Sequence, residues 1–385
     1  MKILLLSHFF TLGAGGAWSV IALIAQLLAE NGHKVWVITN RLEGTEVQHE
    51  NIKIIFVSSQ PSGSNRFKIT DTIRYSFAII RVGISIIRKE KIDIIHSNPV
   101  PALAGSILSL LTSTPLIVVI HDVFSAQKSL WRESLKQKEI SKLNALLRPV
   151  FEKIIIKLKC SAIHTVSEST KDDLMKFGAK KPIYVIHNAI PVDIKENVET
   201  NPLQFISISR LTFYKNVQVV IKSMKILKKS FPNIVLVIVG DGPHRKDLEN
   251  LVTELDLRNN ITFKGHVSEE IKNRLLSSSL ALVFPSLFEG FGLVILEAFA
   301  RKKPVLVSRV RPLTDIVEHN KTGFTLSPHD ENEWAKAMEY LLKEPERASK
   351  MGQAGRKTLE EKYNLEIMQQ RIFEMYNDVM KKKFR

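Results

Sequence analysis

The chain has 385 residues, of which 44% are hydrophobic and 24% charged, and its formal net charge is +16. This length exceeds what one hydrophobic core usually supports, so we expect two domains, and the composition excludes a disordered or fibrous protein. The single cysteine, Cys160, excludes a disulfide framework and a thiolate metal cluster, and it favours a reducing cytoplasm. The positive charge predicts attraction to nucleic acid, anionic lipid or phosphorylated substrates without choosing among them.

In the first half, short apolar runs alternate with segments of helical periodicity. The apolar runs are continuous stretches of Ile, Val and Leu, as expected for parallel strands that helices cover on both faces. We expect strands at residues 2–9, 34–39, 52–57, 92–96 and 116–120, and helices at residues 17–31, 72–89 and 103–111.

The same alternation resumes near residue 203 and predicts a second sheet. Its strands are expected at residues 205–209, 234–239, 261–264, 280–285 and 304–308. The fold class is therefore α/β, with two Rossmann-like, doubly wound parallel-sheet domains facing across a ligand cleft. The predicted parts are an N-terminal domain (1–186), a linker (187–202), a C-terminal domain (203–363), and a helical segment (364–385) that packs back toward the N-terminal domain.

A glycine cluster, Gly13-Ala-Gly15-Gly16, follows the first strand. Glycines between a strand and a helix let the backbone approach an anionic ligand. A dinucleotide-binding turn is disfavoured, because Trp18 stands at the last glycine of that motif and the second strand ends in Thr39-Asn40 rather than an acid. A tight turn without a ligand is the alternative.

Polar pairs follow two of the predicted strands, where a parallel sheet presents its carboxyl edge. His121-Asp122 follows the strand at 116–120, and a histidine there can bond or polarise a hydroxyl, although a structural histidine explains it equally well. Arg210 and Lys215 follow the strand at 205–209. Two such cations can neutralise a diphosphate, although solvated cations are common in this chain.

The segment Glu289-Gly-Phe-Gly-Leu-Val-Ile-Leu-Glu297 carries the strongest signal. A glycine loop leads into a helix expected to begin near Gly292, so that one carboxylate lies on the loop and the other in the first two helical turns. Carboxylates accept hydrogen bonds from ribose and hexose hydroxyls. Both could instead be surface charges, but Glu297 stands among apolar residues, where a carboxylate is rarely placed without a partner.

Taken together, these motifs resemble those of retaining glycosyltransferase family 4, the two-Rossmann-domain (GT-B) group 1 glycosyltransferases. The main marks are the two glutamates separated by seven residues and Ser209-Arg210-Leu211 followed by Lys215-Asn216. The resemblance covers nearly the whole chain. Supporting marks are Gly15-Gly16, Val166-Ser-Glu168, His187-Asn188 and Val239-Gly-Asp-Gly-Pro243.

The resemblance implies a transferase that moves a sugar from a nucleoside-diphosphate sugar, with UDP favoured over GDP, to a lipid-linked or glycan acceptor with retention of configuration. It implies no metal and no cofactor, and the sequence has no convincing Asp-x-Asp motif. Glu289 and His121 are expected at the reacting sugar and Glu297 at the ribose. The remaining donor-binding residues implied are Arg210, Lys215, Gly15, Gly16, Phe291, Gly292 and Leu293.

Some positions depart from the family pattern. Arg311 and Pro312 stand where the family usually has two glycines, and Asp315 replaces a usual glutamate. Asn216 and Ala189 each replace a common glycine. These changes leave the fold prediction intact and weaken the prediction of the donor.

A basic stretch runs from Lys128 to Lys159, with nine basic and three acidic residues among apolar ones. It predicts docking on an anionic membrane, so that a cytoplasmic protein is expected to sit peripherally on the inner face of the plasma membrane. A solvated helix face is the alternative. An epimerase or phosphorylase-like enzyme is the second candidate activity, and nucleic acid is not an expected partner because no nucleic-acid-binding signature is present.

Overall fold

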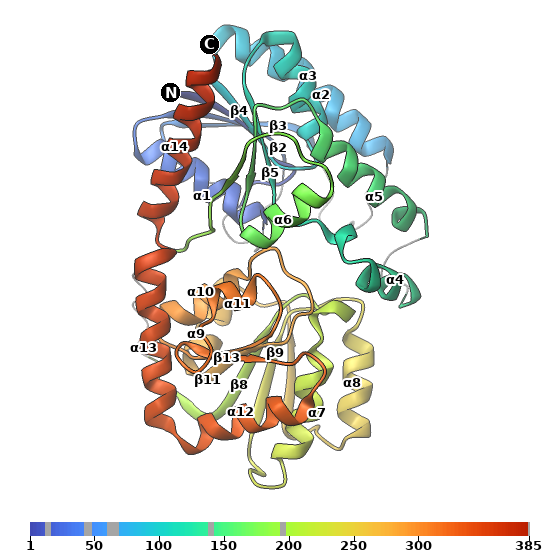
Figure 1. The fold of residues 1–385 in the computed structure, drawn as a ribbon, viewed down its shortest axis with the longest axis vertical. Helices are drawn as coiled ribbons and strands as arrows, with labels where there is room; N and C mark the ends of the chain where they lie inside the picture. The colour runs from blue at the N-terminus through green and yellow to red at the C-terminus, as the bar shows by residue number, and fades with distance from the viewer. Residues whose placement is uncertain (12–16, 42–47, 60–68, 138–141, 193–197, 384–385) are drawn as a thin grey trace. The chain divides into compact units, whose positions relative to one another are not determined.

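The structure is a computed structural model that describes residues 1–11, 17–41, 48–59, 69–137, 142–192 and 198–383 (Figure 1). It contains two compact units, each with its own parallel sheet. The first unit comprises Met1–Val123, Pro149–Asn188 and Leu365–Arg385. The second unit comprises Phe124–Arg148 and Ala189–Asn364, so that residues 124–148 group with the second unit although they follow a strand of the first.

The first unit is built on a seven-stranded sheet in the order β3-β2-β1-β4-β5-β6-β7. Every neighbouring pair is parallel, and β1 pairs with β2 on one side and with β4 on the other. The chain thus reverses its direction of travel across the sheet between β1 and β4. The strands are β1 (Lys2–Leu6), β2 (Lys34–Arg41), β3 (Ile52–Ser59), β4 (Ile94–Ser97), β5 (Leu116–Ile120), β6 (Ala162–Thr165) and β7 (Ile183–Val185).

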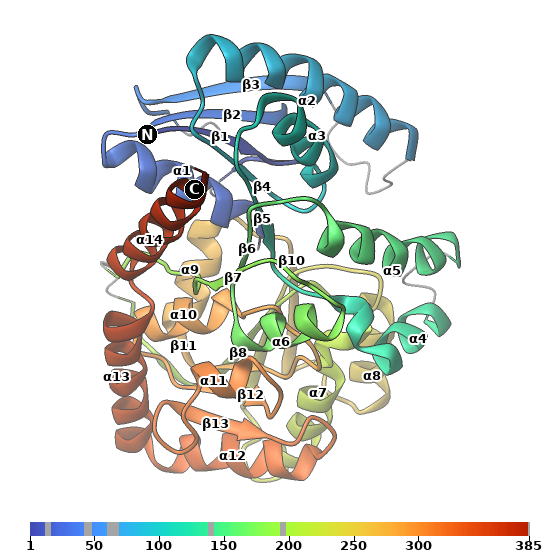
Figure 2. The same ribbon diagram turned by 45° about the horizontal axis from the view of Figure 1, so that its top comes forward.

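Helices of the first unit cover this sheet, and the last of them comes from the end of the chain. Helix α14 lies beside α1 (Figure 2). Its Tyr376 is fully buried, and its hydroxyl lies 2.8 Å from Nδ1 of His96 on β4. The helices are α1 (Ala17–Glu30), α2 (Ile69–Glu90), α3 (Ala102–Thr112), α5 (Lys142–Lys157, which begins in the second unit), α6 (Glu168–Lys176) and α14 (Leu365–Lys383).

The second unit is built on a six-stranded parallel sheet in the order β10-β9-β8-β11-β12-β13. Here the direction of travel reverses between β8 and β11. Strands β11, β12 and β13 are buried along their whole length, and β11 and β12 accordingly consist mostly of Leu, Val, Ala and Phe. The strands are β8 (Asn201–Ile208), β9 (Val235–Val239), β10 (Ile261–Gly265), β11 (Ser279–Phe284), β12 (Val305–Ser308) and β13 (Gly323–Leu326).

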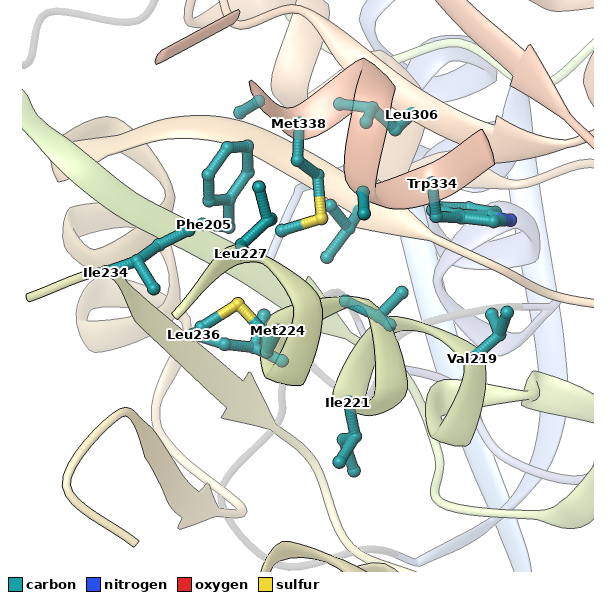
Figure 3. Close-up of a cluster of buried hydrophobic side chains, with 14 of the residues drawn as sticks. Phe205, Val219, Ile221, Met224, Leu227, Ile234, Leu236, Leu306, Trp334 and Met338 are labelled. Atoms are coloured by element: carbon teal, nitrogen blue, oxygen red, sulfur yellow. The ribbon is translucent and has the colours of Figure 1, made fainter. Parts of the chain in front are cut away.

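A large apolar core lies between one face of this sheet and its helices (Figure 3). Phe205 of β8, Met224 of α7 and Met338 of α12 are each completely buried there. Trp334 is also buried, and its indole Nε1 donates a hydrogen bond to the Ser327 carbonyl at 2.9 Å, so its polar atom is satisfied. The helices are α4 (Lys128–Lys136), α7 (Val217–Leu227), α8 (Arg245–Glu254), α9 (Glu269–Ser278), α10 (Leu293–Ala300), α11 (Leu313–Ile316), α12 (Glu331–Lys343) and α13 (Pro345–Lys362), with 3₁₀ turns η1 (Phe124–Ala126) and η2 (Phe213–Lys215).

The predicted α/β class with two Rossmann-like parallel sheets is confirmed. Strand β1 ends at Leu6, earlier than expected, and β8 begins at Asn201, inside the predicted linker. The short strands β6, β7 and β13 were not predicted. Within the described part of the chain, none of the helices combines the length and the apolar character that crossing a bilayer requires.

Candidate active site

The candidate donor site lies at the carboxyl edge of the second sheet, where β8 and β11 are neighbours. In open α/β sheets a ligand binds beside the strands between which the chain reverses its direction. The loops that leave these two strands are joined, because the amide of Leu287 donates to the Tyr214 carbonyl at 2.8 Å. The hydroxyl of Ser286 donates to the same carbonyl at 3.4 Å. The sequence-predicted residues Arg210, Lys215 and Glu289 all lie on these loops.

Lys215 and Glu289 form an ion pair across the two loops, with Nζ of the lysine donating to Oε1 of the glutamate. Their side chains are only 13% and 12% exposed, so the pair is largely screened from water. The Lys215 ammonium also lies 5.3 Å from the ring centroid of Tyr214 and 5.5 Å from that of Phe284. Aromatic faces attract a cation at such distances. The lysine is therefore held by a carboxylate and two rings.

Glycine permits the turn that leads from this loop into α10. Gly292 caps the helix in a left-handed conformation, with φ of 105°. A Cβ atom there would lie 3.1 Å from Ile295 Cδ1 and 3.2 Å from Leu313 Cδ2. The helix then begins at Leu293, with the Ile295 amide donating to the Gly292 carbonyl at 3.0 Å, and the positive end of the helix dipole at this terminus favours an anionic ligand. Phe291, Gly292 and Leu293 thus stand at a helix N-terminus, as the sequence predicted.

Glu297 lies in the second turn of α10, as expected from the sequence. Its apolar neighbours Ile295, Leu296, Ala298 and Phe299 are buried. The carboxylate does have a partner, Lys272 of α9, whose Nζ donates to Oε1 at 3.0 Å. The other carboxylate oxygen, Oε2, is buried and accepts no hydrogen bond from the described residues.

Arg210 follows β8 and its side chain is exposed. The backbone around it is held by a second glycine loop, because the Leu211 amide donates to the Asp241 carbonyl at 2.9 Å. A Cβ atom on Gly240 would stand 1.9 Å from the Ser209 carbonyl oxygen, so only glycine allows this approach. The Val239–Pro243 motif therefore supports the position of Arg210, while its guanidinium stays accessible to a ligand.

An aromatic group borders the ion pair. Phe124 of η1 packs against Tyr214 and Phe288, each with its ring centroid 5.3 Å away. Trp131 of α4 lies 5.6 Å from Phe124, and the Arg148 guanidinium lies 4.8 Å from the Phe124 ring centroid. Tyr214 and Phe288 immediately precede Lys215 and Glu289. Phe124 and Trp131 thus supply an apolar wall beside the candidate donor site, a role that the sequence did not reveal.

His121 lies in the first unit, directly after β5, and its Nε2 is buried without a hydrogen-bond partner among the described residues. Burial, reinforced by His164, lowers the pKa of His121 to about 3. The imidazole is therefore neutral near pH 7. It can exchange hydrogen bonds with a hydroxyl but carries no charge.

Two further buried histidines, His164 and His96, lie between His121 and the last helix of the first unit, α14. His164 of β6 places Nδ1 3.3 Å from Nε2 of His96, whose Nδ1 faces the Tyr376 hydroxyl. Burial lowers the pKa of His164 to about 4 and that of His96 well below its usual value. The sequence analysis treated His121 by itself, whereas the structure gives it these neutral neighbours.

The glycine loop of the first unit lies outside the described residues, so the predictions for Gly15 and Gly16 stay predictions. The carboxyl edge formed by β2, β1 and β4 is polar. The Asn98 side-chain amide donates to Ser7 Oγ at 2.9 Å, and the Asn40 side-chain nitrogen lies 3.1 Å from His8 Nδ1. All four side chains are buried. The sequence analysis missed this group, since its members come from three strands.

Two family models match adjoining parts of the chain. The model described as Glycosyltransferase Family 4 matches residues 14–194, and the model described as Glycosyl transferases group 1 matches residues 191–358. The chain is a group 1 glycosyltransferase of the GT-B type. The transferase class that the sequence predicted is thereby confirmed.

Individual relatives agree with this assignment. The glycogen synthase of Mycobacterium tuberculosis is 25% identical over 93% of this chain and 90% of its own length. The solved sucrose-phosphate synthase of Thermosynechococcus elongatus has a TM-score of 0.80 at 20% identity, covering 98% of each chain. HepE of Anabaena, solved with UDP-glucose, has a TM-score of 0.73 at 18% identity, covering 98% of this chain and 100% of its own. These two likenesses confirm the fold.

In this group 1 glycosyltransferase, an ion pair forms within the loop after β12, where the sequence departs from the family pattern. Arg311 donates through Nε to both carboxylate oxygens of Asp315, at 3.2 and 3.1 Å. Both side chains are about half exposed, so the pair contributes little to stability. The arginine and the aspartate, which each replace a family residue, thus contact one another.

Proposed function

We propose that this glycosyltransferase moves a sugar from a nucleoside-diphosphate sugar to a lipid-linked or polysaccharide acceptor and retains the anomeric configuration. The observation that carries the proposal is the Lys215–Glu289 pair on the two loops where the second sheet reverses. A cation for the diphosphate and a carboxylate for the sugar meet there, beside the N-terminus of α10. An epimerase or phosphorylase-like activity is not favoured, because the relatives are glycosyltransferases.

The negative charge of the proposed leaving group explains why cations line the candidate site. A nucleoside diphosphate gains negative charge as the bond to the sugar breaks, and preorganised cations stabilise that charge most in a partly dry site. Lys215 is positioned for this task, and the exposed Arg210 can add a bidentate contact. When a diphosphate binds, it shares Lys215 with Glu289, which leaves the carboxylate able to accept from sugar hydroxyls.

The base and sugar of the donor follow from likeness alone. HepE binds UDP and UDP-glucose, and this supports a UDP-sugar over a GDP-sugar here. We assign Glu297 to the ribose and the amides of Phe291, Gly292 and Leu293 to the sugar. Gly15 and Gly16 are assigned to the phosphates, and His121 to a hydroxyl of the transferred sugar. The cations supply the electrostatic stabilisation, so we propose that the reaction needs neither a metal nor another cofactor.

The acceptor side includes a surface suited to lipid. Leu147, Val150, Phe151 and Ile154 recur at helical spacing on α5 and are 38%, 53%, 37% and 48% exposed. Lys153 and Lys157 are exposed on the same helix. Because apolar contacts and cations combine on this face, we propose that α5 docks peripherally on an anionic membrane and brings the enzyme to a lipid-linked acceptor.

The test is a screen of UDP-, GDP- and ADP-sugars for binding and for slow hydrolysis, with and without EDTA. We expect UDP-sugars to bind most tightly and EDTA to leave hydrolysis unchanged. Binding by none of the donors would overturn the proposal, whereas loss of activity in EDTA, restored by added Mg²⁺ or Mn²⁺, would overturn only its metal-free part. Analysis of product configuration by NMR tests retention.

A further inference from the structure

Lys272 forms an ion pair with the Glu297 carboxylate, and the sequence motifs do not include it. It lies on α9, 25 residues before the glutamate, and its Nζ stands 3.0 Å from Oε1 of Glu297. It also stands 2.7 Å from Oε2 of Glu269 on its own helix. The Lys272 side chain is 13% exposed, whereas the Glu269 side chain is 50% exposed. The lysine therefore joins an outer carboxylate to the inner one.

The two carboxylates determine the protonation state of Lys272. Burial by itself lowers the pKa of Lys272, but the charges of Glu297 and Glu269 outweigh burial and raise the pKa above its usual value. The ammonium consequently stays charged. A carboxylate among the apolar residues of α10 needs such a partner, because an unpaired charge in that setting is strongly destabilising.

The second carboxylate oxygen of Glu297, Oε2, can still accept hydrogen bonds. Oε2 lies 3.0 Å from the Lys272 ammonium but accepts no hydrogen bond from the described residues. An ionised carboxylate can accept about four hydrogen bonds. The side chain as a whole is 23% exposed, so it remains within reach of a ligand. One side of the carboxylate is anchored, and the other retains acceptor sites.

We infer that Lys272 is a positioning residue for ribose recognition. It holds the Glu297 carboxylate in one orientation, so that the carboxylate can accept from the vicinal 2′- and 3′-hydroxyls of a ribonucleoside diphosphate. This inference rests on the proposed function, in which Glu297 binds the ribose. Without the ammonium, the carboxylate loses its anchor and its selectivity for the diol.

The experiment compares two ligands on one set of variants. The probes are whichever of UDP, GDP and ADP binds the wild type most tightly and the 2′,3′-dideoxy form of that nucleotide, with Kd measured by calorimetry. We expect the wild type to prefer the ribose form by about tenfold or more, as for hydrogen bonds to a charged group. Glu297→Gln and Lys272→Met should reduce this preference to about threefold or less, while Lys272→Arg preserves it. Lys228→Met, which removes a lysine from the exposed pair with Asp256, is the matched control and should change nothing.

The outcomes separate this inference from the proposed function. If no nucleoside diphosphate binds, both fail. If the wild type prefers the ribose form and Glu297→Gln abolishes the preference while Lys272→Met retains it, only the role of Lys272 is wrong. Lys272→Gln is made in parallel, because its neutral side chain can still fill the space if the methionine variant does not fold. A preference that survives in a folded Lys272→Gln also contradicts the inference.

Discussion

Lys215 and Glu289 form a largely buried ion pair that ties the loop after β8 to the loop after β11. Each residue thereby supplies the other with an opposite charge. An unpaired lysine or glutamate with so little exposure would carry a large desolvation cost. The pair therefore fixes the two loops to one another at the candidate site.

Substituting Lys215 or Glu289 should reduce substrate binding or turnover, whereas substitution at an exposed position away from the site should not. Glu289→Gln keeps the shape of the side chain but removes its charge, and we expect kcat to fall by about 10²-fold. Lys215→Met should weaken binding of the nucleoside diphosphate by about tenfold or more. Steady-state kinetics and calorimetry measure these effects, with thermal melting to verify the fold. Glu254→Gln, at an exposed position of α8, is the control, and wild-type activity in Glu289→Gln would refute the assigned role.

His121 should contribute to turnover without setting its pH dependence. His121→Ala is expected to lower kcat by about tenfold or more, since it removes a hydrogen-bonding group from the sugar. Because the pKa of His121 is about 3, its imidazole stays neutral between pH 5 and 8, and the kcat profile of the wild type should show no step from it there. His329→Ala, at an exposed position, serves as the control. Full turnover by a folded His121→Ala variant would contradict the proposal.

The buried histidines should make the protein sensitive to acid. The pKa of His8 and of His164 is lowered to about 4 and that of His121 to about 3, against 6.5 for an accessible histidine. Below pH 6.5 the unfolded chain binds protons at these residues and the folded protein does not. The free energy of unfolding should therefore fall as the pH drops from 6.5 toward 4, by about 1.4 kcal/mol per pH unit for each such histidine.

Denaturant unfolding across this pH range tests the expectation. His164→Asn should show a shallower slope than the wild type, and His329→Asn should keep the wild-type slope. Equal slopes in all three proteins would show that His164 does not resist protonation in the folded state.

Lys303 should make stability rise with pH in the same way, but at the alkaline end. Its ammonium donates to Thr200 Oγ1 at 2.7 Å, and burial lowers its pKa from 10.5 to about 8. Between pH 8 and 10.5 the unfolded chain binds the extra proton, so stability from this residue should increase as the pH rises. At pH 7, Lys303→Met should stabilise the protein by about 1–2 kcal/mol, allowing for partial solvent screening. Lys350→Met, at an exposed site, is the comparison, and a destabilised Lys303→Met would disprove the expectation.

Binding of α5 to membranes should need both its apolar and its basic residues. We expect co-sedimentation with anionic liposomes that weakens with salt and is absent with neutral ones. Lys153→Gln with Lys157→Gln should reduce binding about tenfold or more, at roughly 1 kcal/mol per cation. Val150→Gln with Ile154→Gln should reduce it as well. Lys343→Gln with Lys350→Gln is the matched control, and equal binding to neutral liposomes would rule out the proposed docking.

The sequence predicted the sheets and much of the donor site because both depend on local patterns. Long apolar runs predict strands β5, β9 and β11, and a glycine loop before an apolar helix predicts α10. Strand β6, which reads Ala-Ile-His-Thr, escaped because its histidine interrupts the apolar run. The pairing of Lys272 with Glu297 escaped because it depends on how α9 packs beside α10. Such contacts follow from topology, and no spacing in the chain encodes them.

The return of α14 to the first unit has a consequence for the order of synthesis. Tyr376 fills the interior beside His96, which was made 280 residues earlier. A nascent chain therefore carries an incomplete first domain while every strand of the second sheet is synthesised. Synthesis of α14, rather than completion of the first sheet, is therefore the step after which the amino-terminal half can reach its final stability.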